Sequence, residues 1–180
     1  IMRQSAYVRN IDELVERMGG ILPADELNKF SNILKYFEPI YRELLWKPNY
    51  FSLKNDMEEY REMLRGKKIS ALFNEALLFY NSGNFVDKFV IAFYPIPLRA
   101  KMSNARSIGL FESVGVLVGE KNKKHRLGVI FHELCHGLYE TQSMLFQNTL
   151  EYWFQQNSSL YTKFARNYFD EVLATSLGNG

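Results

Sequence analysis

Two histidines and a glutamate within five consecutive residues have the spacing of a metal site. The segment reads His132-Glu133-Leu134-Cys135-His136. Side chains four residues apart on a helix point the same way, so the two imidazoles would meet at one point. Glu133 would lie beside them and could take a proton from a water molecule held there. The pattern predicts half of a catalytic zinc site together with its general base.

Chance does not account for this arrangement, because the chain contains only three histidines. A match to His-Glu-x-x-His is expected on the order of 0.004 times in a sequence of this composition. The alternative interpretation, two core histidines hydrogen-bonded to backbone, does not explain why Glu133 lies between them. Cys135 is expected to face the helix packing as a small buried hydrophobe, and the alternative is a nucleophile beside His136.

A catalytic zinc ion takes three protein ligands and leaves a fourth position for water, so one ligand must come from outside the motif. His125 would have to fold back from a Lys-rich turn onto its own helix. Glu140 lies a further turn along the same helix, and Glu151 lies in an aromatic segment without distinctive neighbours. Glu171 lies on a later predicted helix with the small Ala174 one turn on, which would let the two helices approach closely. Glu171 is the best matched of these candidates.

The HELCH segment, followed by Asp-Glu-Val-Leu-Ala from Asp170, resembles the gluzincin group of zincin metallopeptidases. The resemblance covers residues 89–177, about half of the chain, and is strongest in these two short segments. It implies one Zn²⁺ ion with His132, His136 and Glu171 as ligands, and Glu133 as the general base. Such a site would hydrolyse peptide bonds through a metal-activated water.

Two positions depart from the familiar gluzincin pattern. Gluzincins often have Asn where this chain has Asp170, and an acidic residue where this chain has Thr175. The acidic residue usually supports a ligand histidine from outside the metal shell. Asp170 and Thr175 are the two candidates for that supporting role here.

The resemblance also implies a substrate-binding role for a strand. In zincins, a strand beside the active-site helix forms one edge of the cleft and pairs with extended substrate. The predicted strand Ser113–Val118 directly precedes the helix and is short enough to be that edge; the alternative is an interior strand. As an edge it would bind substrate through its backbone at Gly115, Val116 and Leu117.

Hydrolysis of an amide also needs a group that stabilises the tetrahedral oxyanion. Three side chains near the third ligand are candidates, and the sequence does not choose among them: Tyr161, Arg166 and Tyr168.

Hydrophobic periodicity predicts helices in the first third of the chain. One runs from Ile11 to Met18, and a second opens at Pro23 and is kinked or divided at Pro39. A connection over residues 47–49 is expected to lead to an N-cap at Asn55, from which a third helix runs to about Tyr80.

The middle of the chain predicts strands and the end predicts helices again. The expected strands are Phe85–Tyr94 and Ser113–Val118, separated by a polar connection over residues 99–106. A cationic turn over residues 121–126 is expected to be solvated, with an anionic-substrate patch as the alternative. The later helices are expected at about 127–140, 144–156 and 159–177. In the 144–156 helix the aromatic run over residues 152–154 is expected to pack in the core, with a substrate pocket as the alternative.

This order predicts an α+β fold with a helical N-terminal region over residues 1–82 and a zincin-like catalytic core over residues 83–180. The core would hold a small sheet with an edge strand, the active-site helix and the third-ligand helix. The N-terminal region is expected to pack against this core. The chain begins at Ile1 and ends at Gly180, soon after Glu171, which is typical of a trimmed product or a fragment of a longer parent.

Composition excludes several classes of protein. The 180 residues carry a net charge of +2, which indicates no nucleic-acid partner. A single cysteine excludes an intrachain disulfide framework, and no apolar run reaches the ~18 to 20 residues of a membrane span. A soluble protein is expected, secreted or periplasmic if a signal segment has been removed, while the compartment and the oligomeric state stay open.

The sequence therefore predicts a zinc-dependent peptidase acting on a peptide or protein substrate. Two alternatives stay open: a noncatalytic zinc-site protein with a binding or regulatory role, and a metal-dependent amidase on non-protein amides. A purely structural site has no need of a base, so Glu133 counts against the first alternative.

Overall fold

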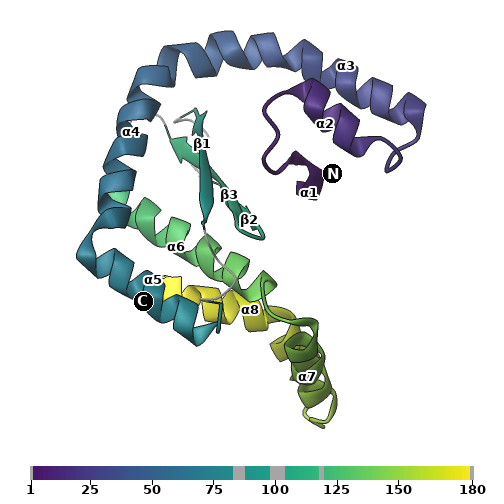
Figure 1. Cartoon of the computed structure of the whole chain (residues 1–180), viewed down its shortest axis with the longest axis vertical. Helices are drawn as coiled ribbons and strands as arrows, with labels where there is room; N and C mark the ends of the chain where they lie inside the picture. The colour runs from purple at the N-terminus through teal and green to yellow at the C-terminus, as the bar shows by residue number, and fades with distance from the viewer. Residues whose placement is uncertain (1, 83–87, 98–103, 118–119, 179–180) are drawn as a thin grey trace.

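The computed structural model describes residues 2–82, 88–97, 104–117 and 120–178 (Figure 1). Helices come first, then three strands, then helices again, which confirms the predicted α+β class. The N-terminal helices are α1 Met2–Ser5, α2 Ile11–Met18, α3 Ala24–Tyr41, the π-helix η1 Arg42–Trp46, α4 Lys47–Arg65 and α5 Lys67–Phe79. The strands are β1 Val90–Ile96, β2 Ala105–Ile108 and β3 Phe111–Leu117, and the last helices are α6 Lys123–Glu140, α7 Met144–Gln155 and α8 Thr162–Gly178.

The helix α2 has the predicted bounds, and the next helix opens after Pro23 as predicted, whereas the predicted connection over residues 47–49 is wrong. From α3 through η1 to α4 the chain is one long bent helix, and Asn55 lies inside α4 rather than at an N-cap (Figure 1). Pro48 falls in the first turn of α4, directly after the wider π-turn, where a missing N–H costs little. The helix ends instead at Gly66, whose backbone is extended.

The sheet has the order β1-β3-β2, so β3 is its central strand. β1 runs parallel to β3, and β2 runs antiparallel to it. The expectation that the segment Ser113–Val118 forms an edge is therefore wrong: β2 covers that side of β3. β2 begins within the segment 99–106 that was predicted to be a polar connection and extends two residues beyond it. Gly109, at φ +56°, makes the tight turn between β2 and β3. The first part of the predicted strand Phe85–Tyr94, and Val118, lie outside the described residues.

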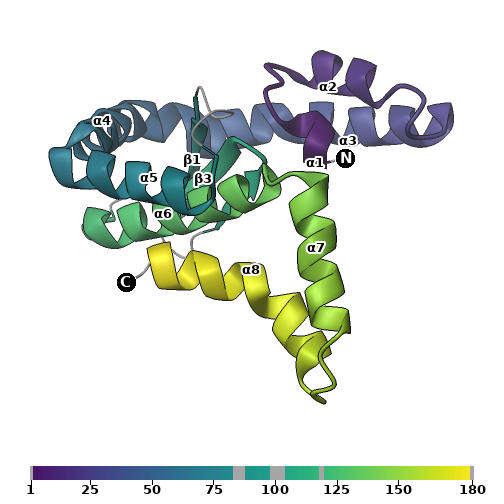
Figure 2. The ribbon, with the colours of Figure 1, turned by 60° about the horizontal axis from the view of Figure 1, so that its bottom comes forward.

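Two apolar clusters form the core. In the first, α5 packs against α6 and α8 through buried side chains that include Tyr80, Leu138 and Ala174. In the second, Tyr60 of α4 stacks on Phe93 of β1, with ring centroids 5.3 Å apart. Both clusters combine residues from the predicted N-terminal region, 1–82, with residues from the predicted core, 83–180. Figure 2 shows α5, α6 and α8 layered, with α7 leading away from the end of α6 and α8 returning.

The cationic segment over residues 121–126 was predicted to be a solvated turn, but from Lys123 it is the first turn of α6, and two of its side chains are tied to the protein. Arg126 is 1% exposed and donates from Nε and Nη2 to the carboxylate of Glu120, at 2.9 to 3.1 Å. Lys123 forms ion pairs with Asp56 and Glu59 of α4. A guanidinium is buried only when a partner compensates for its lost hydration, and a sequence pattern does not reveal the partner. No helix among the described residues is long and apolar enough to cross a membrane.

Candidate metal centre

The structure brings the three predicted ligand side chains together. His132 and His136 lie on one face of α6, with their Nε2 atoms 3.1 Å apart. Glu171 reaches them from α8: its Oε1 lies 3.4 Å from Nε2 of His132, and its Oε2 lies 3.3 Å from Nε2 of His136. This group can hold a metal ion.

The spacing of these atoms fits a tetrahedral ion. Ligand atoms at about 2.0 to 2.1 Å from a tetrahedral zinc ion lie about 3.3 to 3.4 Å from one another. The two nitrogens lie 3.1 Å apart, and each lies 3.3 to 3.4 Å from a different oxygen of Glu171. Each of these contacts has the length of a ligand-to-ligand distance, and one ligand atom from each of the three residues lies within 4.8 Å of the other two. Two imidazoles and one carboxylate are also a donor set that catalytic zinc sites use.

Asp170 orients one of the two histidines. Its Oδ2 lies 2.8 Å from Nδ1 of His136, so that Nδ1–H donates to the carboxylate and the lone pair of Nε2 points toward Glu171. The same hydrogen bond raises the pKa of His136, and burial acts in the opposite direction. Thr175, the other candidate for this role, is exposed, and its side chain forms no hydrogen bond within the described ranges. The Nδ1 atom of His132 is buried, without a hydrogen-bond partner in the same ranges.

The predicted base, Glu133, is oriented by the sheet. Its Oε2 accepts a hydrogen bond from the backbone N–H of Ser107 in β2, at 2.8 Å. Two helical turns on, Oε2 of Glu140 accepts from the N–H of Gly109, at 2.7 Å. The outer edge of β2 therefore lies along α6, and Oε1 of Glu133 has no hydrogen-bond partner among the described residues. The role of Ser107 could not be predicted from the sequence, because β2 is short and its centre, Arg106-Ser107, is polar.

Small residues allow the close packing that builds the site. Ala174 is fully buried between α8 and α6, as expected from its size. At Gly178, one turn further on, a Cβ atom would lie 2.5 Å from Cα of His132. At Gly137 of α6 a Cβ atom would lie 2.4 Å from the carbonyl oxygen of Gly109. Glycine at these two positions lets α8 and the β2–β3 turn come close enough to place Glu171 and to hold Glu133.

A second carboxyl group is buried next to the base. Glu112 of β3 lies opposite Ser107 in the sheet, is 0% exposed, and has no hydrogen-bond partner for either carboxylate oxygen among the described residues. Burial raises the pKa of Glu112 to about 9, and the charge of Glu133 acts in the same direction. Glu112 is therefore neutral at pH 7. Its one signal in the sequence is an acidic residue at an inward position of a β-branched strand.

The backbone predicted to bind substrate is already paired. The N–H of Gly115 donates to the carbonyl of Asn104, at 2.7 Å, and Ile96 fills the space beside Gly115, where a Cβ would meet its Cδ1 at 2.2 Å. Val116 and Leu117 pair with β1, and Val116 is 3% exposed. The assignment of substrate binding to Gly115, Val116 and Leu117 is wrong, because this strand lies inside the sheet.

The three side chains that were candidates for stabilising the oxyanion differ in position. Tyr168 lies three residues before Glu171, on the same face of α8, and is exposed. Arg166 donates from Nε to Oε2 of Glu151 on α7, at 2.6 Å, and lies on another face of α8. Tyr161 precedes α8 by one residue and lies about 15 Å along the helix from Glu171. Tyr168 is the candidate that the helix places next to the metal centre.

Two residues that sequence analysis had left open are remote from this chemistry. Cys135 is fully buried in the first core cluster, and burial raises its pKa to about 11, so the core interpretation is confirmed. His125 is exposed in the first turn of α6 and is not part of the metal-binding group. In the aromatic run of α7, Phe154 is buried while Tyr152 and Trp153 are exposed, so the core prediction holds for Phe154 alone.

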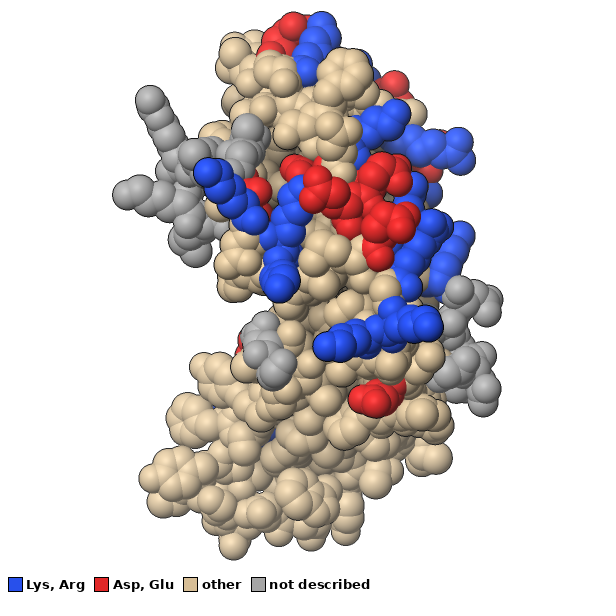
Figure 3. All heavy atoms as spheres, turned by 90° about the vertical axis from the view of Figure 1, so that its left-hand side faces the viewer, with Lys and Arg blue, Asp and Glu red and all other residues tan. Residues whose placement is uncertain are grey.

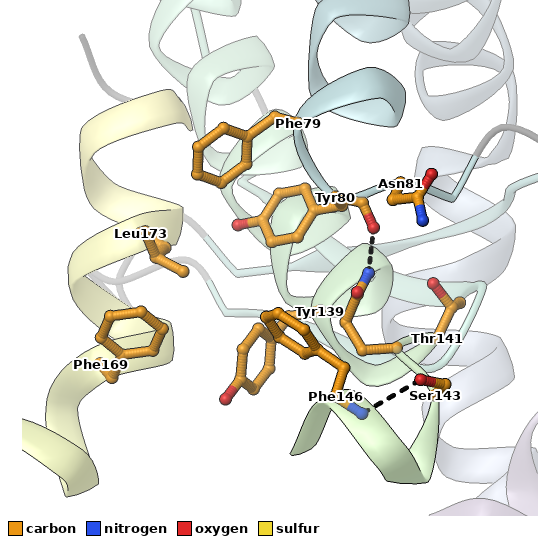
Figure 4. Close-up of a pocket in the computed structure, with 10 residues that line it drawn as sticks. Phe79, Tyr80, Asn81, Tyr139, Thr141, Ser143, Phe146, Phe169 and Leu173 are labelled. Carbon is orange, nitrogen blue, oxygen red and sulfur yellow. Dashed lines mark hydrogen bonds between the residues drawn. The ribbon is translucent and has the colours of Figure 1, made fainter. Parts of the chain in front are cut away.

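A cavity of about 350 Å³ lies on the opposite flank of α8 from Glu171 (Figure 4). It is walled by side chains from four helices, among them Phe79, Tyr139, Phe146, Phe169 and Leu173. None of the three metal-binding side chains lines it. The cavity is therefore separate from the metal centre.

No protein-family model, no curated protein and no solved structure matches this chain. Support for the candidate metal centre therefore comes from its own geometry.

Proposed function

We propose that the chain is a zinc-dependent peptidase with His132, His136 and Glu171 as metal ligands and Glu133 as general base. One observation carries this proposal: two imidazole nitrogens and the Glu171 carboxylate lie close enough together to share one ion, and a further carboxylate lies next to the histidines on the same helix. A closed structural zinc site takes four protein ligands and needs no base. Three ligand residues with a separate carboxylate beside them are the arrangement of a hydrolytic site.

Each residue has a separate part in the reaction. A bound zinc ion would supply a Lewis acid that lowers the pKa of water and polarises the scissile carbonyl. Glu133 accepts the proton of the attacking water on Oε1, while Ser107 holds Oε2 in place. The same carboxyl group then delivers this proton to the leaving amine. We assign to Tyr168, three residues before Glu171 on α8, the donation of a hydroxyl hydrogen to the developing oxyanion.

The outer edge of β2 supports the base in this proposal. The N–H of Ser107 points away from β3, toward α6, and donates to Glu133, while the N–H of Gly109 donates to Glu140.

The test compares the wild-type chain with Glu133→Gln. Elemental analysis is expected to find one zinc per chain in both proteins, because Glu133 is not a ligand. Cleavage of a mixed peptide library is expected for the wild type, with loss in the presence of a chelator and recovery on addition of zinc. The variant is expected to lose at least a hundredfold in turnover. Unchanged turnover in Glu133→Gln would exclude the mechanism.

The remaining outcomes identify the alternatives. Stoichiometric zinc without cleavage of any peptide points to a noncatalytic zinc protein. Hydrolysis of small non-protein amides without peptide cleavage points to an amidase. Glu171→Gln is expected to lower zinc affinity, and an unchanged affinity would exclude Glu171 as a ligand.

A further inference from the structure

On the basis of the proposed function, we infer that α8 selects an extended polypeptide with bulky apolar side chains at the first and third residues on one side of the scissile bond. The surface concerned is the α8 stripe, defined as Tyr161, Phe164 and Tyr168. These residues are 75%, 63% and 61% exposed. Exposed aromatic rings in such a row are unusual on a helix that faces only water.

The α8 stripe leads directly to a metal ligand. Its members and Glu171 follow one another at intervals of three, four and three residues, so they share one face of the helix. The opposite flank of α8 carries Arg166 and Phe169, which contact Glu151 and Phe154 of α7. The stripe is therefore on the flank that α7 leaves uncovered, on the side of the metal centre.

The position of the stripe along α6 also fits a substrate path. α8 runs antiparallel to α6: Asp170 contacts His136, and Phe169 contacts Tyr139 nearer the end of α6. The stripe thus starts beside His136 and continues past the end of α6. The β2–β3 turn lies at the same end of α6, where Gly109 binds Glu140.

Simple geometry gives the spacing of the apolar side chains. With a rise of 1.5 Å per residue, Tyr168 lies about 4.5 Å and Phe164 about 10.5 Å along the helix from Glu171. An extended chain advances about 3.4 Å per residue, and alternate side chains face the same way. The first and third residues from the scissile bond therefore both face the stripe, at about the distances of Tyr168 and Phe164.

The charge distribution favours an apolar occupant. From residue 141 to residue 169 the charged side chains are Glu151, Lys163 and Arg166, and Glu151 and Arg166 pair with each other. Figure 3 shows charged side chains gathered over the upper part of the molecule, around α4, whereas its lower end, where α7 lies, is almost free of charge on this face. An acidic or basic substrate residue would find little to pair with here.

The experiment uses the full chain loaded with zinc and a panel of peptides that place Phe, Leu or Ala at the first and third residues on either side of one cleavable bond. Phe164→Ala is expected to lower kcat/KM about tenfold for peptides with an apolar third residue, and less than twofold for peptides with Ala there. Tyr168→Phe keeps the ring, so it should retain the preference even where loss of the hydroxyl lowers kcat for all peptides alike. Trp153→Ala is the matched control, since Trp153 is an equally exposed aromatic residue on α7.

If Phe164→Ala leaves the preference for apolar peptides unchanged, the inference is wrong while the proposed peptidase activity stands. If the wild type cleaves no peptide, binding of the panel to zinc-loaded Glu133→Gln, measured by fluorescence anisotropy, separates the two proposals. If adding Phe164→Ala to Glu133→Gln abolishes binding of the apolar peptides, the stripe is supported and the peptidase proposal is rejected. If all peptides bind equally, both proposals are rejected. A dimer that dissociates in Phe164→Ala, seen by light scattering, shows instead that the stripe is an interface between copies and also overturns the inference.

Discussion

The Nδ1 atom of His136 and the Oδ2 atom of Asp170 lie 2.8 Å apart, at the contact between α6 and α8. The two residues belong to helices that also supply the histidine pair and the carboxylate of the candidate metal centre. Through this hydrogen bond the helix that carries Glu171 also fixes the ring orientation of a histidine on the other helix. We therefore expect zinc binding to depend on Asp170.

Asp170→Ala is expected to weaken zinc binding 10- to 100-fold, because the His136 ring loses the partner that fixes its tautomer and orientation. Asp170→Asn keeps a hydrogen-bond acceptor and should weaken binding less. Competition with a chromophoric chelator measures both affinities. Thr175→Ala is the control and should bind zinc as the wild type does, since Thr175 is exposed. Equal affinities for Asp170→Ala and the wild type would contradict the role of Asp170.

The buried carboxyl of Glu112 predicts a pH-dependent stability. Its pKa is about 9 in the folded chain against 4.5 for an exposed glutamate, so between these values the folded state binds one more proton than the unfolded state. The free energy of unfolding therefore falls as pH rises, by at most about 1.4 kcal/mol per pH unit. Glu112→Gln cannot ionise and should gain stability relative to the wild type between pH 5.5 and pH 8.5.

Urea unfolding of both proteins at several pH values measures this difference, and the effect of pH on the other groups cancels in it. Glu133→Gln alone should reduce the pH dependence, since the charge of Glu133 is part of what raises the pKa of Glu112. A difference between wild type and Glu112→Gln that stays constant with pH would show that Glu112 is ionised in the fold.

Gly137→Ala is expected to destabilise the protein although alanine favours helix. A Cβ atom there would lie 2.4 Å from the carbonyl oxygen of Gly109, so α6 and the β2–β3 turn would have to move apart. Overpacking of this kind costs about 1 to 3 kcal/mol, against a gain in helix propensity of about 1 kcal/mol. The urea midpoint measures the net effect, and a higher midpoint for the variant would refute the close contact.

Cys135 should be unreactive in the folded chain. Its thiol is fully buried, and burial raises its pKa to about 11, so almost no thiolate exists near neutral pH. A thiol reagent is expected to label it only after unfolding in urea, with the unfolded protein as the positive control. Rapid labelling of the folded protein would instead reopen the nucleophile hypothesis.

Patterns within one helix could be predicted from the sequence. The His132 and His136 pair follows from a spacing of four, and the small Ala174 correctly indicated a close helix contact. Both inferences use only the geometry of a single helix and the size of a side chain. Ser107 could not be found in this way, because its role depends on where β2 docks against α6.

The errors have the same origin. Pro48 was expected to lie in a connection, because the π-turn that precedes it leaves no clear mark in the sequence. Ser113–Val118 was expected at an edge, since the strand that covers it has two polar residues at its centre. Arg126 was expected in water, because its burial depends on pairing with Glu120. In each case tertiary contacts overrode local propensity.

The hydrogen bond from Ser107 to Glu133 joins residues 26 positions apart in the chain, and that between His136 and Asp170 joins residues 34 apart. Both contacts close long loops, whereas the histidine pair is arranged within α6 alone. Orientation of the base needs β2 docked against α6, and the third ligand needs α8. Local opening of either contact would therefore disable the proposed site while leaving the two imidazoles together on their helix.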